Sequence, residues 1–278
     1  MNRKYEKLSH QLDKLPFIDE LRIKFATTSD EFLQAMKLIH QAYKKKGLVN
    51  DNKECYFSPY ILLPKNKIIV IKKNQKVIGT ISVIEDSPLG IPMDKVHPED
   101  INSLRKKKIN FIEIGAFAIA PKYHHYGLSL LLYRAAFIYI NQYTNADCAV
   151  IAVHPRVSKL YNNLFQFEVF GNEKEYESLN DAKSIPLLAK SSNSVKFIKN
   201  NKILSRDIEK NNILSEYTDS LNIYDSEGKD IDNIFIWNDN CILNYFNKCE
   251  IKLNQLPLKQ KELLDWLYPV LRSHSSID

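Results

Sequence analysis

The chain of 278 residues carries 39 lysine and arginine residues against 33 aspartate and glutamate residues, which gives a formal net charge of +6. This length allows one large domain, or one domain with an extension, and a hydrophobic content of 44% is ordinary for a globular protein. The mild charge and the lack of a nucleic-acid-binding motif favour an acidic protein surface or a phosphorylated ligand as partner, and not nucleic acid. No apolar run is long enough to span a membrane, and residues 1–15 lack the apolar core of a signal peptide, so we expect a cytoplasmic protein.

The four cysteines, Cys55, Cys148, Cys241 and Cys249, are scattered without the paired spacing of a zinc site. We therefore expect reduced thiols, with neither a disulfide framework nor a bound metal. Cys148 lies at the start of an apolar stretch, which indicates an inert thiol in the core.

The first third of the chain shows the periodicities of a mixed α/β domain. The pattern predicts a helical arm over residues 1–20, a strand over 21–26, a helix that begins after Thr27–Glu31 and ends near Gly47, and a hairpin of strands 67–72 and 76–84. A loop over residues 86–94 carries two prolines and a glycine, and a short helix over 98–107 follows it. The hairpin makes this part of the sheet antiparallel, which excludes a Rossmann fold.

The stretch from residue 111 to residue 143 organises the rest of the chain. Phe111–Ile119 is apolar except for Glu113, as in a strand that is buried on both faces. After a basic and aromatic turn, Gly127 precedes a long predicted helix, Leu128–Tyr143, whose first N–H groups have no partner inside the helix. Strand, glycine turn and helix start together predict an anion-binding site.

The remaining pattern predicts a strand over residues 147–153, a helix over 156–164 and weaker strands over 167–170 and 185–190. The expected fold class is α/β (α+β), with a mixed, mostly antiparallel central sheet and helices on both faces. A change of composition at residues 191–194 marks the start of a C-terminal extension (193–278) of unknown role. The chain then divides into an N-terminal arm (1–20), a main domain (21–192) and this extension. Apolar clusters at 234–237, 241–246 and 263–267 predict helices or short strands in the extension.

The residues around Gly127 resemble a known phosphate-binding loop. His124-x-x-Gly127-x-Ser129, between a strand and a helix, resembles the Q/R-x-x-G-x-G/A loop of the GNAT superfamily of acyl-CoA N-acyltransferases. Further matches resemble the branch of long-chain N-acyl amino acid synthases, which is related to acyl-homoserine-lactone synthases. They are Gly79-Thr80, the run D-S-P-L-G-I-P-M-D at Asp86–Asp94, Glu113-Ile114-Gly115, His154-Pro155-Arg156 and Leu160-Tyr161.

The resemblance, over roughly residues 20–190, implies a GNAT-like fold and an N-acyltransferase without a metal. The donor would be a long-chain acyl thioester on acyl carrier protein or CoA, and the acceptor a small-molecule amine, of the amino acid class. The thioester would lie in a gap between the strands at 115–119 and 149–153, with acyl carrier protein as partner. The implied site residues are Glu113 as general base, Tyr161 as general acid, Phe117, Ala118, Ile119, His124, Gly127, Leu128 and Ser129 at the donor, and Asp86, Ser87 and Arg156 along the acceptor or acyl site.

Two positions depart from the pattern of this family. Ala116 stands where arginine is usual, and Gln166 stands where glycine is usual. The first departure leaves open how an acceptor carboxylate or the acyl carbonyl is held, and it allows a changed acceptor or a loss of activity.

Each candidate also has a purely structural interpretation. Glu113 would be a carboxylate paired with a lysine or arginine, Tyr161 an aromatic that packs on Phe165, and Gly127 a plain turn. The side chains of three residues would be solvated: His124, His125 and Arg156. The loop 86–94 would lie on the surface. The basic runs 44–46 and 105–108 would be solvated instead of docking a carrier protein. Two rival functions therefore remain, an acetyl-CoA-dependent N-acetyltransferase and a non-catalytic GNAT-like protein that binds a ligand or partner.

Overall fold

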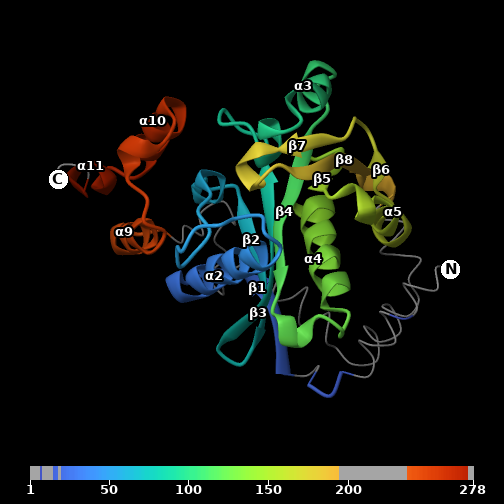
Figure 1. Cartoon of the computed structure of the whole chain (residues 1–278), viewed down its shortest axis with the longest axis horizontal. Coiled ribbons are helices and arrows are strands. Elements are labelled where there is room, and N and C mark those ends of the chain that lie inside the picture. The colour runs from blue at the N-terminus through green and yellow to red at the C-terminus, as the bar shows by residue number, and fades with distance from the viewer. Residues whose placement is uncertain (1–6, 8–14, 18–19, 194–236, 275–278) are drawn as a thin grey trace.

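The computed structural model describes residues 7, 15–17, 20–193 and 237–274 (Figure 1). Most of the predicted arm over 1–20, and the polar stretch from 195 to 230, lie outside the described residues. None of the described helices is both long and apolar enough to cross a membrane.

One central sheet forms the body of the fold, with the strand order β1-β2-β3-β4-β5-β8-β6 and with β7 paired to β8. The strands are β1 (Leu21–Phe25), β2 (Lys67–Lys73), β3 (Lys76–Glu85), β4 (Phe111–Ile119), β5 (Cys148–Val153), β6 (Glu168–Val169), β7 (Lys174–Tyr176) and β8 (Ala182–Lys190). All neighbours are antiparallel except β4 and β5. The predicted class, a mixed and mostly antiparallel sheet, is confirmed.

Helices cover both faces of this sheet (Figure 1). They are α2 (Ser29–Lys45), α3 (Pro98–Lys106), α4 (Leu128–Tyr143) and α5 (Ser158–Phe165), followed by α9 (Asp239–Lys248), α10 (Leu258–Leu267) and α11 (Val270–His274). Short 3-10 turns connect them: η2 (Pro59–Leu62), η3 (Pro92–Lys95), η4 (Pro121–Tyr123), η5 (Pro155–Val157), η6 (Glu177–Leu179) and η8 (Leu253–Gln255). The strand and helix predicted around Gly127 match β4 and α4, whereas β7 was not predicted.

The start of α2 shows how local sequence fixes an element. The hydroxyl of Thr28 accepts a hydrogen bond from the N–H of Glu31 at 3.2 Å, which caps the helix. The Glu31 carboxylate is itself buried and forms ion pairs with Lys24 and Lys72. Burial raises the pKa of Glu31, but the bonds from the two lysines lower it to about 2. The pairs anchor the helix start to β1 and β2.

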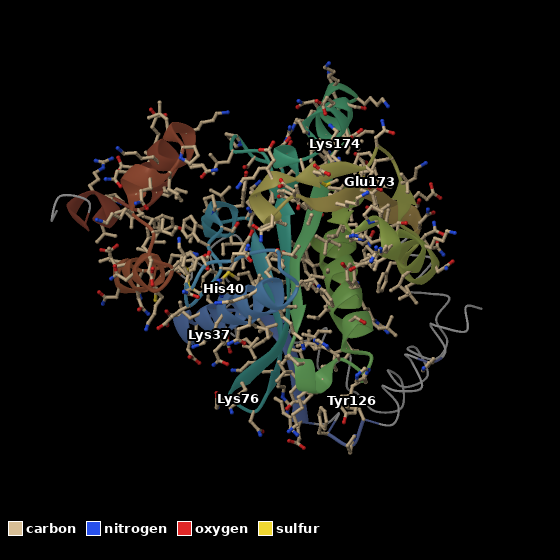
Figure 2. All side chains as sticks on the ribbon, in the orientation of Figure 1. Lys37, His40, Lys76, Tyr126, Glu173 and Lys174 are labelled. Atoms are coloured by element: carbon tan, nitrogen blue, oxygen red, sulfur yellow. A yellow bond between two sulfur atoms is a disulfide. The ribbon has the colours of Figure 1, made fainter. Side chains whose placement is uncertain are left out.

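The two faces of the sheet carry two separate apolar clusters. Alternate residues of the central strands, such as Ile112 and Ile114, pack with α4, which is buried at twelve of its sixteen positions. The other face packs against α2 and, beyond it, against α9–α11. At the end of the molecule where α3 lies, Lys174 of β7 forms an ion pair with Glu99 (Figure 2).

The C-terminal helices are fastened to the segment that follows α2. Phe32 of α2 packs edge-on against Trp237 and Tyr245, with ring centroids 4.2 Å and 4.9 Å away. The hydroxyl of Tyr245 donates to the carbonyl oxygen of Tyr56 at 3.0 Å and accepts from the N–H of Ser58 at 3.2 Å. These bonds fix residues 55–58 from a helix about 190 residues away in sequence.

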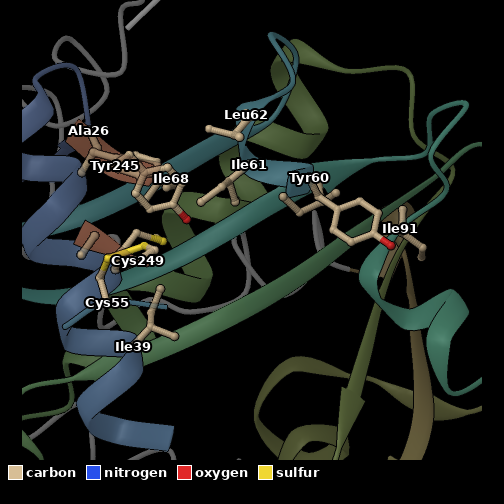
Figure 3. Close-up of a cluster of buried hydrophobic side chains, with 14 of the residues drawn as sticks. Ala26, Ile39, Cys55, Tyr60, Ile61, Leu62, Ile68, Ile91, Tyr245 and Cys249 are labelled. Atoms are coloured by element: carbon tan, nitrogen blue, oxygen red, sulfur yellow. A yellow bond between two sulfur atoms is a disulfide. The ribbon is translucent and has the colours of Figure 1, made fainter. Parts of the chain in front are cut away.

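A disulfide joins Cys55 to Cys249, with their Cα atoms 5.2 Å apart (Figure 3). The expectation of reduced thiols is therefore wrong for these two residues, whereas Cys148 and Cys241 are free. A separation of 194 residues leaves no spacing signal, because only the docking of α9 brings the pair together. The bond and the Tyr245 contacts fasten the same short segment.

We predict that Cys249→Ala unfolds at a lower temperature than the oxidised wild type. A bond that spans 194 residues restricts the unfolded chain, so its loss should lower the free energy of unfolding by about 2–4 kcal/mol. Peptide mapping without reductant should find the linked peptides, and thermal melts with and without reductant should measure the effect. Cys241→Ala is the matched control, since Cys241 is a free thiol in α9, the helix that ends just before Cys249. Equal melting temperatures of wild type and Cys249→Ala without reductant would contradict the prediction.

Candidate active site

The strands β4 and β5 separate in the middle of the sheet. Their parallel pairing runs from Phe111–Cys148 only to Glu113–Val150, while β5 stays paired with β8 as far as Val153–Ile185. Beyond the last pair, residues 115–117 of β4 are only half-buried although β4 is a central strand. The separation predicted beside residues 115–119 is confirmed, and it opens the sheet next to Glu113.

A bulge shapes the same stretch of β4. The register with β3 shifts there, so that Ile81 alone faces both Ala116 and Phe117. Ala116 adopts a left-handed conformation with φ of 45°, which is uncommon for a residue with a side chain. A bulge takes main-chain polar groups out of the regular ladder, and it leaves them free to meet a ligand.

Glu113 is a buried carboxyl, 6% exposed, on the face of the sheet that carries α2. Its Oε2 accepts a hydrogen bond from the main-chain N–H of Met93 at 2.8 Å. Burial raises the pKa of Glu113 to about 8; the Met93 N–H and Lys95 work against this rise and Asp94 adds to it. In the described part of the chain no lysine or arginine forms a salt bridge with Glu113. The paired-carboxylate interpretation is not what the structure shows.

Four buried or half-buried tyrosines lie around Glu113 and come from separate elements. They are Tyr43 at the end of α2, Tyr56 in the loop after it, Tyr60 in η2 and Tyr176 in β7. Burial, and to a smaller extent the charge of Glu113, raises the pKa of all four hydroxyls, to about 12 for Tyr56 and Tyr60. All four therefore stay protonated around the carboxyl. Tyr60 reaches from η2 toward Ile91, at the start of η3 (Figure 3).

An arginine clamp fixes the loop that presents Met93. Arg105 of α3 binds Asp86 through Nε at 2.8 Å and Asp94 through its two terminal nitrogens at 2.7 Å and 2.6 Å. Asp94 Oδ2 also accepts from the N–H of Ile91 at 2.8 Å. A Cβ atom on Gly90, where φ is 74°, would lie 2.3 Å from this oxygen, so the turn needs glycine. The clamp thus holds η3 beside Glu113.

The predicted residues of this loop therefore have structural partners. Asp86 is bound by Arg105, and the hydroxyl of Ser87 donates to the carbonyl oxygen of Gly90 at 3.1 Å. Their role along the acceptor or acyl site stays a prediction. Arg105 itself is not a solvated member of the basic run 105–108, of which residues 106–108 are exposed.

The predicted anion site lies at the start of α4. Gly127 has a φ of 72°, and no side chain caps the helix. His124 is exposed, and its Nε2 donates to the carbonyl oxygen of Ile119 at 2.7 Å, which ties the turn to the end of β4. The N–H groups of Leu128 and Ser129 begin the helix beside this turn, an arrangement that suits a phosphate. Ligand binding by these four residues stays a prediction.

Tyr161 of α5 lies on the α4 face of the sheet. The hydroxyl of Tyr133 donates to that of Tyr161 at 3.3 Å, and Tyr161 also packs against Phe165, as its structural interpretation expected. Burial raises the pKa of Tyr161, although the bond from Tyr133 lowers it. No described hydrogen bond or ion pair joins Tyr161 to Glu113, which lies on the α2 face of the sheet. Arg156 is exposed in η5, and no described hydrogen bond or ion pair links its side chain to either candidate.

Sequence reasoning missed the tyrosines and the Met93 N–H. The chain holds 15 tyrosines, but this count does not tell which of them meet. The structure explains why Gln166 stands where glycine is usual. It ends α5 with a left-handed φ of 59°, a conformation that glycine adopts readily at the end of a helix.

Comparison with known proteins matches residues 34–190, more than half of the chain, to the family model of the N-acyl amino acid synthase FeeM. The solved structure of FeeM, from uncultured soil microbes, has a TM-score of 0.56 at 19% identity, over 62% of this chain and 92% of that chain. The synthase LasI gives a TM-score of 0.46 at 18% identity, over 62% and 89%. An acyl-CoA N-acyltransferase from Pseudomonas aeruginosa gives 0.41 at 10%, over 60% and 97%. No curated protein sequence matches the chain. The likeness to FeeM shows a GNAT-like fold.

We predict that Glu113→Gln flattens the dependence of stability on pH. The pKa of Glu113 is about 8 in the folded protein and near 4.5 in an unfolded chain, so the unfolded state loses this proton first as the pH rises. The stability that the neutral carboxyl contributes is therefore full below pH 4.5 and is lost as the pH rises to about 8. Glutamine has no such loss, so its melting temperature relative to wild type should increase from pH 5 to pH 8.5. A constant difference between the two proteins would contradict the prediction.

Proposed function

Because the chain belongs to the N-acyl amino acid synthase family represented by FeeM, and is thus an acyltransferase, we propose that it transfers a long-chain acyl group from acyl carrier protein to the amine of an amino acid. The observation that carries the proposal is Glu113, a carboxyl that lies next to the separation of β4 and β5 with a pKa near neutrality and no salt bridge within the described residues. A thioester in that opening would have its carbonyl carbon within reach of both faces of the sheet.

In the proposed reaction, the nitrogen of the acceptor amine attacks the thioester carbonyl. Glu113 takes the proton from that nitrogen, directly or through water, as the new C–N bond forms. The main-chain groups released at the bulge, near Phe117–Ile119, bind the oxyanion that develops on the carbonyl oxygen. The C–S bond then breaks, and the thiolate takes a proton from Tyr161, whose raised pKa keeps it protonated until that step.

The choice of acyl carrier protein over CoA rests on the family and on the surface around the candidate site. The start of α4 has His124 and Ser129 where GNAT loops that bind CoA have other residues. Exposed lysines at residues 106–108 and 44–46 offer positive charge to an acidic carrier. The role of the uncapped helix start would then be to meet the single phosphate of phosphopantetheine.

We expect faster turnover with an acyl-carrier-protein donor than with the matched acyl-CoA, and an advantage that shrinks as salt rises from 20 to 200 mM. Initial rates with both donors and one amino acid acceptor measure this. Replacement of Lys106 and Lys107 by glutamine should raise KM for the carrier donor and leave KM for acyl-CoA unchanged. Faster, salt-insensitive turnover with acetyl-CoA would instead identify an ordinary N-acetyltransferase.

For catalysis, we expect Glu113→Gln to lower kcat by roughly 10²–10⁴, because glutamine cannot take the amine proton. The wild-type rate should rise with pH to a plateau above about pH 8, following the pKa of Glu113, and the variant should lose this profile. Single-turnover acyl transfer measures both effects.

Glu31→Gln is the matched control for this experiment. It makes the same change at a buried carboxylate that is held in ion pairs with Lys24 and Lys72. It should lower the melting temperature and leave the rate per folded molecule unchanged. If Glu113→Gln behaves in the same way, Glu113 is a structural residue and not the base.

A further inference from the structure

Thr80 of β3 carries a buried hydroxyl that has no partner among the described residues. The residue is 0% exposed, and its Oγ1 forms no hydrogen bond with any described residue. A buried hydroxyl without a hydrogen bond is destabilising, and native proteins rarely keep one. An unpaired hydroxyl at a candidate active site therefore points to a ligand that supplies the partner.

The strand alternation places Thr80 on the same face as Glu113. A Cβ atom on the preceding Gly79 would touch Leu132 of α4 at 3.3 Å, so Thr80 faces the opposite side, toward α2. A Cβ atom on Gly115 would lie 3.5 Å from Oε1 of Glu113 and 3.8 Å from Oγ of Ser82. Thr80, Ser82 and Glu113 are thus polar groups on one face of the two neighbouring strands.

Thr80 lies beside small residues of β4. Thr80 pairs directly with Ala118 of β4, and the bulge at Ala116 and the bare Gly115 complete that side of the strand. Residues 115 and 116 are half-buried, beyond the last pair of β4 with β5. Thr80 itself is fully buried, so a substrate that enters there has to open this part of the site to reach the hydroxyl.

We propose that Thr80 is a substrate-binding residue whose hydroxyl donates a hydrogen bond to an oxygen of the bound substrate, either the thioester carbonyl or the carboxylate of the amine acceptor. The inference rests on the proposed function and adds a residue to its site. Ala118 and Ala116 present little side-chain bulk beside the hydroxyl, and Glu113 lies farther along the same face. The bond would satisfy the hydroxyl only in the loaded enzyme.

The test compares Thr80→Val, which has the same shape without the hydroxyl, with Thr80→Ser, which keeps the hydroxyl. Thr80→Val should melt at the wild-type temperature or above, because it removes an unpaired polar atom from the core. Its KM should rise about 3- to 10-fold for one substrate only, with kcat little changed. A rise for the acyl donor identifies the carbonyl as partner, and a rise for the amine identifies the carboxylate. Thr80→Ser should restore the KM.

Thr144→Val is the matched control. The hydroxyl of Thr144 donates to the carbonyl oxygen of Ile140 at 2.6 Å at the end of α4, so its loss should lower the melting temperature and leave both KM values unchanged. If Thr80→Val shows this same pattern, or leaves stability and kinetics both unchanged, the inference is wrong.

A binding measurement separates this inference from the proposed function. N-dodecanoylglycine, a product of the proposed class, carries both the carbonyl and the carboxylate, and calorimetry measures its affinity without turnover. Weaker binding to Thr80→Val by about 3- to 10-fold supports the inference, even if the wild type proves inactive. An active wild type with equal affinity for the probe in Thr80→Val overturns the inference and leaves the function standing, and a wild type that neither binds the probe nor transfers acyl groups overturns both.

Discussion

The burial of Glu113 without a salt bridge from any residue that the structure describes is the constraint on which the candidate site depends. A carboxyl in such a place keeps its proton near neutral pH, and its described hydrogen bond is the N–H of Met93. That N–H is held in turn by a series of contacts. Arg105 binds Asp94, Asp94 binds the N–H of Ile91, and the hydroxyl of Tyr176 donates to the carbonyl oxygen of Pro92 at 3.0 Å. The loop over residues 86–94 therefore positions the N–H that binds Glu113, and this bond partly offsets the effect of burial on the pKa of the carboxyl.

The C-terminal helices also support the candidate site, through the segment that follows α2. Tyr245 holds the main chain at Tyr56 and Ser58, and Tyr268 donates to the carbonyl oxygen of Leu62 at 2.6 Å. The segment between these contacts carries two of the tyrosines near Glu113, and the Cys55–Cys249 bond closes it at one end. The family match stops at residue 190, and the described helices beyond it support the segment that carries these tyrosines.

The sequence predicted those features that depend on neighbouring residues and missed those that depend on distant ones. β4, Gly127 and α4 were predictable because the apolar run, the glycine and the helical periodicity lie within one stretch of 33 residues, Phe111–Tyr143. Glu113 stood out as the one charged residue of Phe111–Ile119. The pairing of Cys55 with Cys249, the clamp of Arg105 on Asp86 and the bond from Tyr176 to Pro92 have no local pattern, since the tertiary fold alone creates them. Ala116, which stands where arginine is usual, lies in the bulge of β4. Its left-handed backbone interrupts the pairing with β3 there, which the sequence alone does not show.

Side chains alternate between the two faces of β3 and β4. One face packs into the core that stabilises the fold, and the other carries the candidate functional residues. Ile81, Val83, Ile112 and Ile114 point to α4 and form a continuous apolar layer with it. Thr80, Ser82 and Glu113 lie on the opposite face, beside the small residues and the bulge of β4. The apolar layer can stabilise the sheet whatever happens on the other face, and this lets the second face keep an unpaired hydroxyl and a proton-bearing carboxyl that a uniform core would exclude. Because a shift of one residue would exchange the two faces, the register of the β3–β4 pair is the feature that keeps stability and chemistry apart.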